Sequence, residues 1–371
     1  MRHMYKALFI DGIRNDQKSG GRTSTDLFLE KVCKYNTLYM QGLRLNDWKV
    51  FLFILNFPGP VFSLLNKLLP FSLFELFTKL SIVNVVTVLK IILSKNYDKV
   101  YLNHHSLFLL SFIINPKKTK VILICHDILN LKKQDRQPIL LKFVDNYITC
   151  KLENYLLKRA SAVIVFSYDD YAHVMSIGAR KVFTLPIVDI ASAKERFISK
   201  SRRFGLIGNW SRKENKDGAI EFFRDFTLLA DQNFNGSFVI AGHGAASLED
   251  KITNINPQMN VSFNDSYKGI RDLELSYLIA PINSGAGIKL KTLECVIEGI
   301  PVLGTPQAFT GLPPKCKKTA GIEVATVQRL ALSIAKDNFT SALEEFDPKK
   351  FWDEYKKFID KNLYDVGCVD V

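Results

Sequence analysis

The most informative part of this 371-residue chain is Leu278–Thr305, LIAPINSGAGIKLKTLECVIEGIPVLGT. An apolar run ends at Pro281 and a loop of small residues follows. Leucine and isoleucine then recur at helical spacing from about Ile288 to Glu298. Gly299 is placed to end that helix, and Pro301 opens the next apolar run. Strand, glycine loop, helix and strand in this order predict a βαβ unit with parallel strands.

The loop and the first helical turn of this unit suit a diphosphate. Glycines let the backbone approach a ligand closely, and unpaired N–H groups at the helix start face it. Lys289 adds a cation, and Glu294, more than a turn further on, is placed to accept hydrogen bonds from ribose hydroxyls. A Gly-x-Gly turn alone is more often just a tight connection, whereas loop, lysine, glutamate and Gly-x-Pro together are specific. The expected nucleotide-binding residues of this stretch are Ser284, Gly285, Ala286, Gly287, Ile288, Lys289 and Glu294.

Similar apolar runs, rich in β-branched residues, alternate with helix-period segments over the rest of the chain. In the first half the expected strands are Lys6–Ile10, Lys99–Leu102, Val121–Cys125, Ala162–Phe166 and Val182–Leu185. In the second half they are Phe204–Ile207, Phe238–Ala241, Asn260–Phe263, Tyr277–Ala280 and Pro301–Leu303. Continuous apolar strands separated by helices indicate parallel sheets covered on both faces. Two such series in a chain of this length predict two doubly wound α/β domains.

The boundary between the two series is expected near residues 186–202, where a polar, basic stretch follows Pro186. We therefore expect an N-terminal domain over 1–188 and a C-terminal domain over 200–345. A last segment, 346–371, is expected to form a helix that returns to the N-terminal domain. Its residues Phe351, Tyr355 and Phe358 share one helical face and need burial.

The positive charge of the chain is concentrated in its first half. Of the net charge of +13, residues 1–180 carry +12 and residues 181–371 carry +1. This asymmetry favours an anionic partner for the N-terminal half, although a charge that serves only solubility is the simpler alternative. No zinc-finger spacing, RNP-like run or helix-turn-helix pattern supports nucleic acid as that partner.

The segment Val50–Leu93 is rich in Phe and Leu and carries the single lysines Lys67, Lys79 and Lys90. Apolar faces bordered by lysines are typical of helices on an anionic membrane surface, and the alternative is that they pack on their own sheet. We find neither a signal peptide nor a membrane-spanning run, so we expect a cytoplasmic protein. The scattered cysteines indicate reduced thiols rather than disulfides or a zinc site, and they are Cys33, Cys125, Cys150, Cys295, Cys316 and Cys368.

Several stretches together resemble glycosyltransferase family 4, the "group 1" glycosyltransferases. Leu278–Thr305 is similar to the family's donor-binding sequence, and Phe204–Phe223, FGLIGNWSRKENKDGAIEFF, is similar to its first C-domain strand, Gly-Asn loop and helix. Shorter resemblances cover the rest of the chain except residues 40–100, and they are Ala241–Gly244, Glu153–Pro186, Cys125–Asp127 and Gly20–Gly21.

The resemblance implies a GT-B fold, with two Rossmann-like domains whose parallel sheets face a central cleft. It implies a nucleotide-sugar donor held by the C-terminal domain and a retaining transfer to a glycan or lipid-linked acceptor. The setting it implies is bacterial-type capsule, lipopolysaccharide or exopolysaccharide assembly on the cytoplasmic face of the inner membrane. No metal cofactor is expected, because lysine, arginine and helix dipoles supply the positive charge.

The resemblance also assigns residues beyond the glycine loop. Further donor-binding residues are Gly208, Asn209, Arg212, Lys213 and Gly242. His126 and Glu294 are the expected catalytic residues, and Gly20 with Gly21 forms the acceptor-side loop. For Arg212 and Lys213 a solvated turn is the alternative, and for His126 a purely structural, hydrogen-bonded histidine.

The chain departs from the family at Ala286, where many members carry a first glutamate eight positions before the one matched by Glu294. That glutamate lies near the donor sugar in the family, so the sugar and the stereochemistry stay open. The alternatives are a non-transferring GT-B enzyme such as a sugar-nucleotide epimerase, an inactive partner subunit, and a basic nucleic-acid-binding protein.

Overall fold

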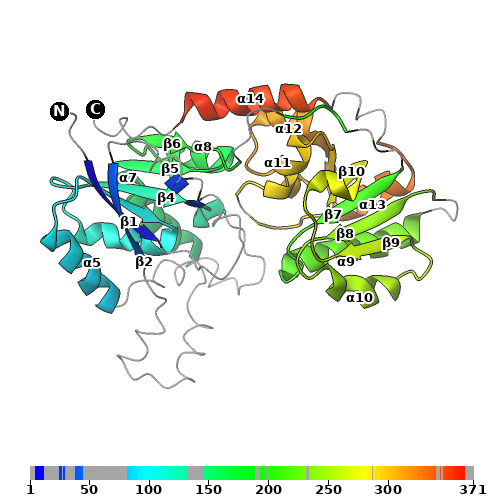
Figure 1. The fold of residues 1–371 in the computed structure, drawn as a ribbon, viewed down its shortest axis with the longest axis horizontal. Helices are drawn as coiled ribbons and strands as arrows, with labels where there is room; N and C mark the ends of the chain where they lie inside the picture. Colours follow the sequence, from blue (N-terminus) through cyan, green and yellow to red (C-terminus); the bar gives the residue numbers. More distant parts are fainter. Residues whose placement is uncertain are drawn as a thin grey trace, which may run out of the picture. The chain divides into compact units, whose positions relative to one another are not determined.

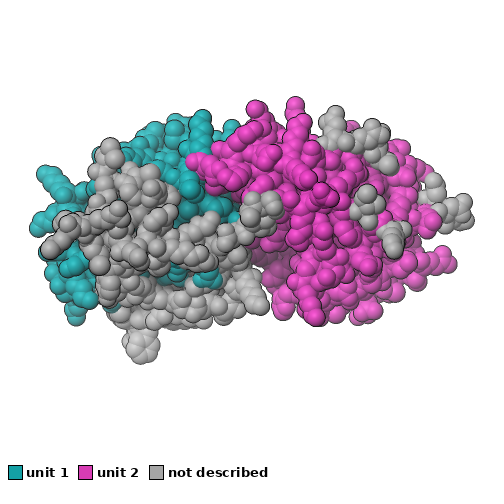
Figure 2. Space-filling view, turned by 45° about the horizontal axis from the view of Figure 1, so that its top comes forward, with its two compact units in different colours: residues 1–189, 361–371 teal, residues 190–360 magenta. Residues whose placement is uncertain are grey.

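The computed structural model divides into two compact units, residues 1–189 with 361–371 and residues 190–360 (Figure 2). The described residues are 5–11, 25–26, 28–29, 38–44, 82–131, 145–188, 193–197, 199, 201–230, 234–285, 287–339, 343 and 346–363. Gly20, Gly21, Ala286 and most of the segment Val50–Leu93 lie outside them, so the expectations for these residues stay predictions. The two units are described separately below.

The first unit is built on a parallel sheet in the order β2-β1-β3-β4-β5-β6 (Figure 1). Its strands are β1 Tyr5–Asp11, β2 Leu38–Arg44, β3 Lys99–Asn103, β4 Lys120–Cys125, β5 Ala162–Val165 and β6 Val182–Thr184. Its helices are α5 Ile82–Ser94, α7 Cys150–Arg159 and α8 Tyr168–Ser176, with the shorter turns η1 His105–Ile113, η2 Leu129–Leu131 and η3 Asp145–Thr149. Strands β3 and β5 are buried along their whole length, as expected for strands covered on both faces.

The second unit has a parallel sheet in the order β12-β11-β10-β7-β8-β9. Its strands are β7 Arg203–Ile207, β8 Ser237–Ala241, β9 Val261–Asn264, β10 Tyr277–Ala280, β11 Val302–Gly304 and β12 Gly321–Glu323. Its helices are α9 Lys213–Leu229, α10 Glu249–Thr253, α11 Leu290–Ile297, α12 Pro314–Ala320, α13 Val327–Ala335 and α14 Pro348–Lys361. Single turns are η4 Ala245–Leu248, η5 Ile270–Leu273 and η6 Pro306–Phe309.

In each parallel sheet, the direction in which the chain adds successive strands reverses at one point. Taking β7 as the first strand, the second sheet has the order 3-2-1-4-5-6, and the reversal lies between β7 and β10. The first sheet reverses between β1 and β3. In open parallel sheets, ligands bind at the carboxyl ends of the strands beside such a reversal. Each unit therefore has one edge where a site is expected.

Aromatic packing holds α9 beside the reversal of the second sheet, between β7 and β10. Phe223 and Phe226 of α9 are buried against Phe238 of β8, with ring centroids 5.3 and 5.0 Å apart. Each buried aromatic side chain contributes about 1.5–3 kcal/mol. A Cβ on Gly218 of α9 would lie 2.1 Å from the carbonyl oxygen of Pro281, so the absence of a side chain lets α9 approach the end of β10. The first turn of α9 is thereby held beside the carboxyl edge of the sheet.

The ten expected strands are all present, with bounds shifted by at most one residue, and two edge strands were not expected. Strand β2, LYMQGLR, lacks a continuous apolar run because it contains Gln41, Gly42 and Arg44. Strand β12 spans only Gly321–Glu323, too short for a periodicity. Helix α8 begins at Tyr168, because Ser167 caps it by accepting a hydrogen bond from the backbone N–H of Asp170 at 3.0 Å.

The last helix has its described contacts in the second unit. Phe351 and Tyr355 of α14 are buried, and the thiol of Cys316 in α12 lies 3.8 Å from the carbonyl oxygen of Phe351. Beyond α14 the chain joins the first unit, where the Thr184 N–H donates to the carbonyl oxygen of Asn362 at 2.7 Å. The return of the helix itself to the N-terminal domain, and the three-part division of the chain, stay predictions.

Candidate functional site

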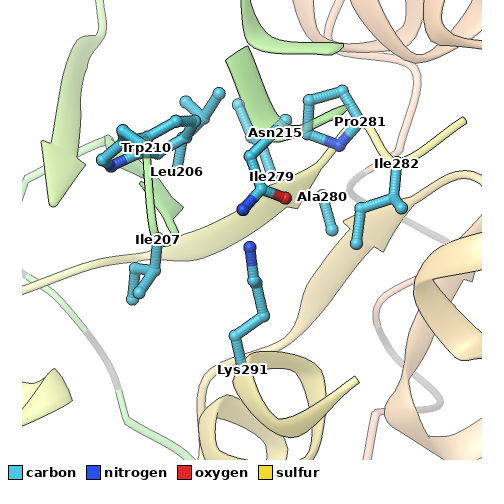
Figure 3. Close-up of a pocket in the computed structure, with 9 residues that line it drawn as sticks. All are labelled: Leu206, Ile207, Trp210, Asn215, Ile279, Ala280, Pro281, Ile282 and Lys291. Carbon is cyan, nitrogen blue, oxygen red and sulfur yellow. The ribbon is translucent and has the colours of Figure 1, made fainter. Parts of the chain in front are cut away.

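A pocket opens at the reversal of the second sheet, between the carboxyl ends of β7 and β10 (Figure 3). Lys291 extends from the first turn of α11 toward the side-chain amide of Asn215 on α9 (Figure 3). The lining residues are Leu206, Ile207, Trp210, Asn215, Ile279, Ala280, Pro281, Ile282 and Lys291. A largely apolar wall with a few convergent polar groups is typical of a small-molecule site.

Two glycine turns border this pocket without side chains. Gly208 follows β7, and a Cβ on it would lie 3.0 Å from the Lys291 ammonium. Gly242 follows β8 with a φ of 110°, and a Cβ there would lie 2.2 Å from the carbonyl oxygen of Gly208. Any larger residue at either position would therefore displace the other turn or fill the space in front of Lys291. Both glycines are among the predicted donor-binding residues, and that assignment stays a prediction.

The loop from Ser284 to Lys289 leads into α11, which begins at Leu290 rather than at the expected Ile288. Lys289 occupies the N-cap position, and no side chain caps the helix. The first N–H groups of an α-helix have no partner within it, and the helix dipole makes this end positive. The start of α11 is therefore suited to an anion.

Three cationic side chains interact around the start of α11. The pKa of Lys291 is lowered to about 8, first by burial and then by the positive charges of Lys289 and Arg212. Glu214 and Cys295 act in the opposite direction. Like charges gathered beside a desolvated ammonium are unfavourable without an anion between them, so this cluster marks a candidate phosphate site.

Two carboxylates follow along α11, and they have different surroundings. Glu298 pairs with Lys194 at 2.6 Å and with Arg271 at 3.2 Å. Glu294 is half-buried, and burial followed by the charge of Glu298 raises its pKa. The pKa of Tyr267 is raised to about 12, first by burial and then by the charge of Glu294. The charge of Glu294 is thus felt at the phenol of Tyr267.

The turn after β7 holds the remaining predicted residues, Asn209, Arg212 and Lys213, in different surroundings. The side-chain oxygen of Asn209 accepts hydrogen bonds from the Ser211 N–H at 3.0 Å and from the Ser211 hydroxyl at 2.6 Å, so it shapes the turn. Arg212 and Lys213 are both exposed; Arg212 contributes to the electrostatics of Lys291, and Lys213 is the first residue of α9. The structure therefore brings together Arg212, Lys289 and the two glycine turns, and it gives Asn209 a structural role.

Sequence reasoning missed two polar residues that line this pocket, Lys291 and Asn215. Lys289 and Lys291 are two positions apart, and on a regular helix two such residues point in different directions. Because α11 starts one residue after Lys289, both lysines instead reach the same region. The late helix start was not detectable from apolar periodicity, since Leu290 and Leu293 fit a helix with either beginning.

The first unit places His126 at the reversal of its own sheet. The His126 Nε2 atom lies 2.8 Å from the Asn103 Oδ1 atom and 3.5 Å from the Thr25 hydroxyl. The ring stacks on Phe166 with centroids 4.9 Å apart. Burial, followed by the charge of His105, lowers the pKa of His126 to about 3, so the ring is neutral. His126 is thus hydrogen-bonded and follows β4 at the carboxyl edge of the sheet, the edge where open parallel sheets bind ligands. Its catalytic role stays a prediction.

Among the described residues, no group of three or more His, Cys, Asp or Glu side chains is arranged to hold a metal ion. None of the helices in the described part of the chain combines the length and apolar character needed to cross a bilayer.

Several solved structures share this fold at low sequence identity. S. aureus MnaA, in a structure with UDP, is 13% identical, with 93% of this chain and 92% of MnaA covered and a TM-score of 0.54. Anabaena HepE in complex with UDP is 14% identical, with 96% and 100% covered and a TM-score of 0.53. The UDP-GlcNAc 2-epimerase of Neisseria meningitidis, bound to UDP-GlcNAc, is 15% identical, with 96% and 99% covered and a TM-score of 0.52.

The match to a TarM variant of S. aureus covers 76% of this chain and 59% of the TarM chain, at 15% identity and a TM-score of 0.47. Neither a protein-family model nor a curated protein sequence matches the chain. The structural likenesses confirm the expected fold class, two parallel-sheet α/β units as in GT-B proteins. Membership in glycosyltransferase family 4 stays a prediction.

Proposed function

We propose that this chain is a glycosyltransferase of family 4 that moves a sugar from a nucleoside-diphosphate sugar to an acceptor. The observation that carries the proposal is the cluster of Lys289, Lys291 and Arg212 at the uncapped start of α11. It lies beside glycine turns at the reversal of a doubly wound sheet, where nucleotides bind in such folds. The sequence resemblance assigns the same stretch to the donor.

The chemistry of transfer fits these residues. As the bond from the sugar to the diphosphate breaks, negative charge grows on the leaving nucleoside diphosphate. The three cations and the α11 N–H groups would stabilise that charge, each charge-assisted hydrogen bond contributing roughly 1.5–3 kcal/mol. This is the work that a divalent metal performs in other enzymes, so we propose that transfer needs none. Glu294 would hold the ribose hydroxyls.

We propose UDP as the nucleotide. MnaA and HepE were each solved with UDP, and the Neisseria epimerase was solved with UDP-GlcNAc. Tyr267, half-buried beside Glu294, offers a ring and a hydroxyl to a pyrimidine next to the ribose. UDP is therefore the first ligand to test, with GDP, ADP and CMP as comparisons.

The proposed acceptor is a glycan or a lipid-linked saccharide on an anionic membrane surface. The net charge of +12 on residues 1–180 supports an anionic partner for the first unit, and each Lys or Arg near such a surface contributes about 1 kcal/mol. Capsule, lipopolysaccharide or exopolysaccharide assembly on the cytoplasmic face of the inner membrane is the setting we propose, with retention at the transferred carbon.

A second candidate is a sugar-nucleotide epimerase that shares the donor site. It is favoured by the Neisseria epimerase, which matches this chain over 96% of its length. The two functions differ in what they need. A transferase forms a new glycoside only when an acceptor is added, whereas an epimerase converts the nucleotide sugar alone.

The proposal is tested in two steps. Calorimetric titration with the four nucleotides should single out one, with UDP expected. Purified protein is then incubated with UDP-sugars in the presence and absence of acceptor lipid extract, and the sugar products are identified. Absence of binding to any nucleotide by the intact protein would refute the donor site, and conversion of the donor without acceptor would favour the epimerase.

A further inference from the structure

A buried polar cluster occupies the carboxyl edge of the first sheet, where it reverses between β1 and β3. Asp11 ends β1, Asn103 ends β3, and His126 follows β4. Thr25 completes the cluster. Asp11, Asn103 and Thr25 are 6%, 0% and 1% exposed, so their hydrogen bonds are made within the protein. Sequence reasoning had selected only His126 from this set.

The charge of Asp11 determines which way the Asn103 amide points. The Asn103 Nδ2 atom lies 3.0 Å from the Asp11 carboxylate and 3.0 Å from the Thr25 hydroxyl. An amide nitrogen donates and an amide oxygen only accepts. In the reversed orientation the amide oxygen would face a carboxylate oxygen at 3.0 Å, with no proton between them. Asn103 therefore directs its Oδ1 atom at His126.

The orientation of the amide in turn determines the tautomer of the imidazole. Oδ1 of Asn103 lies 2.8 Å from Nε2 of His126, and because Oδ1 only accepts, Nε2 must carry the hydrogen. The ring is neutral at physiological pH, since burial and the charge of His105 lower its pKa to about 3. A neutral imidazole has one N–H, so Nδ1 of His126 is an acceptor.

We propose that Asn103 is a positioning residue, oriented by Asp11, which holds His126 as the Nε2–H tautomer so that Nδ1 accepts a hydrogen bond from a sugar hydroxyl. The inference rests on the proposed glycosyltransferase function. It gives His126 a defined task, because an imidazole that binds a proton so weakly orients a hydroxyl rather than deprotonating it or donating a proton. The ligand class is a saccharide, the substrate part that offers hydroxyl donors.

Nuclear magnetic resonance of the full chain with ¹⁵N-labelled histidine tests the tautomer without any substrate. At pH 7, His126 should show one protonated nitrogen, Nε2, with an N–H signal protected from exchange, and a His126→Gln spectrum assigns it. Asp11→Asn releases the Asn103 amide to rotate and should raise the Nδ1–H population. A charged ring, or a wild-type ring protonated at Nδ1, would overturn the proposal.

Kinetics with Asn103→Leu tests the functional half. The loss of one aligned hydrogen bond should raise KM for the sugar-bearing substrate about two- to tenfold, and the His126 Nε2–H signal should lose its protection. UDP affinity should stay at the wild-type value, since the donor residues belong to the second unit. Asp11→Asn keeps size and polarity and should change KM in the same direction, so the outcome does not depend on how Asn103→Leu folds.

A matched control lies on the same unit, where the Asn154 Oδ1 atom is 3.3 Å from the His173 Nε2 atom. Asn154→Leu should change the His173 signal and leave KM and His126 unchanged. Unchanged KM in both Asn103→Leu and Asp11→Asn, with the tautomer altered, would refute the role of the tautomer. Wild-type protein that binds no nucleotide would instead refute the proposed function, with the tautomer result unaffected.

Discussion

Lys291→Met distinguishes two effects of the donor site, its effect on the free energy of unfolding and its effect on the affinity for nucleotide. The substitution keeps the length of the side chain and removes the ammonium. Because burial lowers the pKa of Lys291 from 10.5 to about 8, holding it charged costs the folded protein roughly 3 kcal/mol at pH 7. This cost is fully present below pH 8 and falls as pH rises from 8 toward 10.5, where only the unfolded chain still binds the proton.

Without nucleotide, Lys291→Met should therefore be more stable than the wild type at pH 7, by up to about 3 kcal/mol. At saturating nucleotide this difference in stability should shrink by roughly 1.5–3 kcal/mol, because the wild type binds the nucleotide more tightly. Loss of a charge-assisted hydrogen bond of roughly 1.5–3 kcal/mol weakens UDP binding about ten- to a hundredfold. Thermal unfolding with and without UDP measures the first effect, and calorimetric titration measures the second.

The pH dependence of the titration identifies the ammonium. A bound diphosphate should raise the pKa of Lys291, so wild-type affinity falls by up to tenfold per pH unit above about pH 8. Lys291→Met should bind weakly at every pH, without that slope. Lys251→Met, which removes an exposed lysine of α10, is the charge-matched control and should behave as the wild type. A Lys291→Met protein that binds UDP normally, or that is strongly destabilised without it, would refute this reasoning.

Arg212→Met should weaken UDP binding more than Lys213→Met, since only Arg212 influences Lys291; equal affinities on titration would contradict this. Gly242→Val should lose UDP binding and unfold at a lower temperature, because its Cβ would lie 2.2 Å from the Gly208 carbonyl oxygen at a φ of 110°; normal binding would show that the turns are not part of the site. Transfer activity should persist in EDTA, and activity restored only by Mn²⁺ or Mg²⁺ would refute metal-independent transfer. Flotation with anionic liposomes should fall as salt rises, and protein that stays unbound at low salt would exclude the membrane surface as a partner.

The sequence predicted the sheets well because their central strands carry continuous apolar runs. It did not predict β2, whose Gln41, Gly42 and Arg44 interrupt any such run, or β12, which is held by pairing with β11 rather than by its own composition. Both are edge strands, where burial on two faces is not required. Strand prediction from apolar runs therefore fails first at the edges of a parallel sheet.

The candidate site was predictable where chemistry follows from local spacing. The glycine turns, Lys289 and Glu294 lie on one strand–loop–helix stretch or directly after a strand. Lys291, Tyr267 and Asn103 depend on contacts between distant segments, and no local spacing marks them. Arg212 and Lys213 look alike in sequence, and only the path of the turn after β7 distinguishes them.

Hydrogen–deuterium exchange with and without UDP tests the central claim, that the second unit holds the donor at the start of α11. Protection on adding UDP should appear in 283–297 and in the turns after β7 and β8, and be absent from 99–166 of the first unit. It should be lost in Lys291→Met at a concentration of UDP that saturates the wild type. No protection, or protection confined to the first unit, would contradict the account.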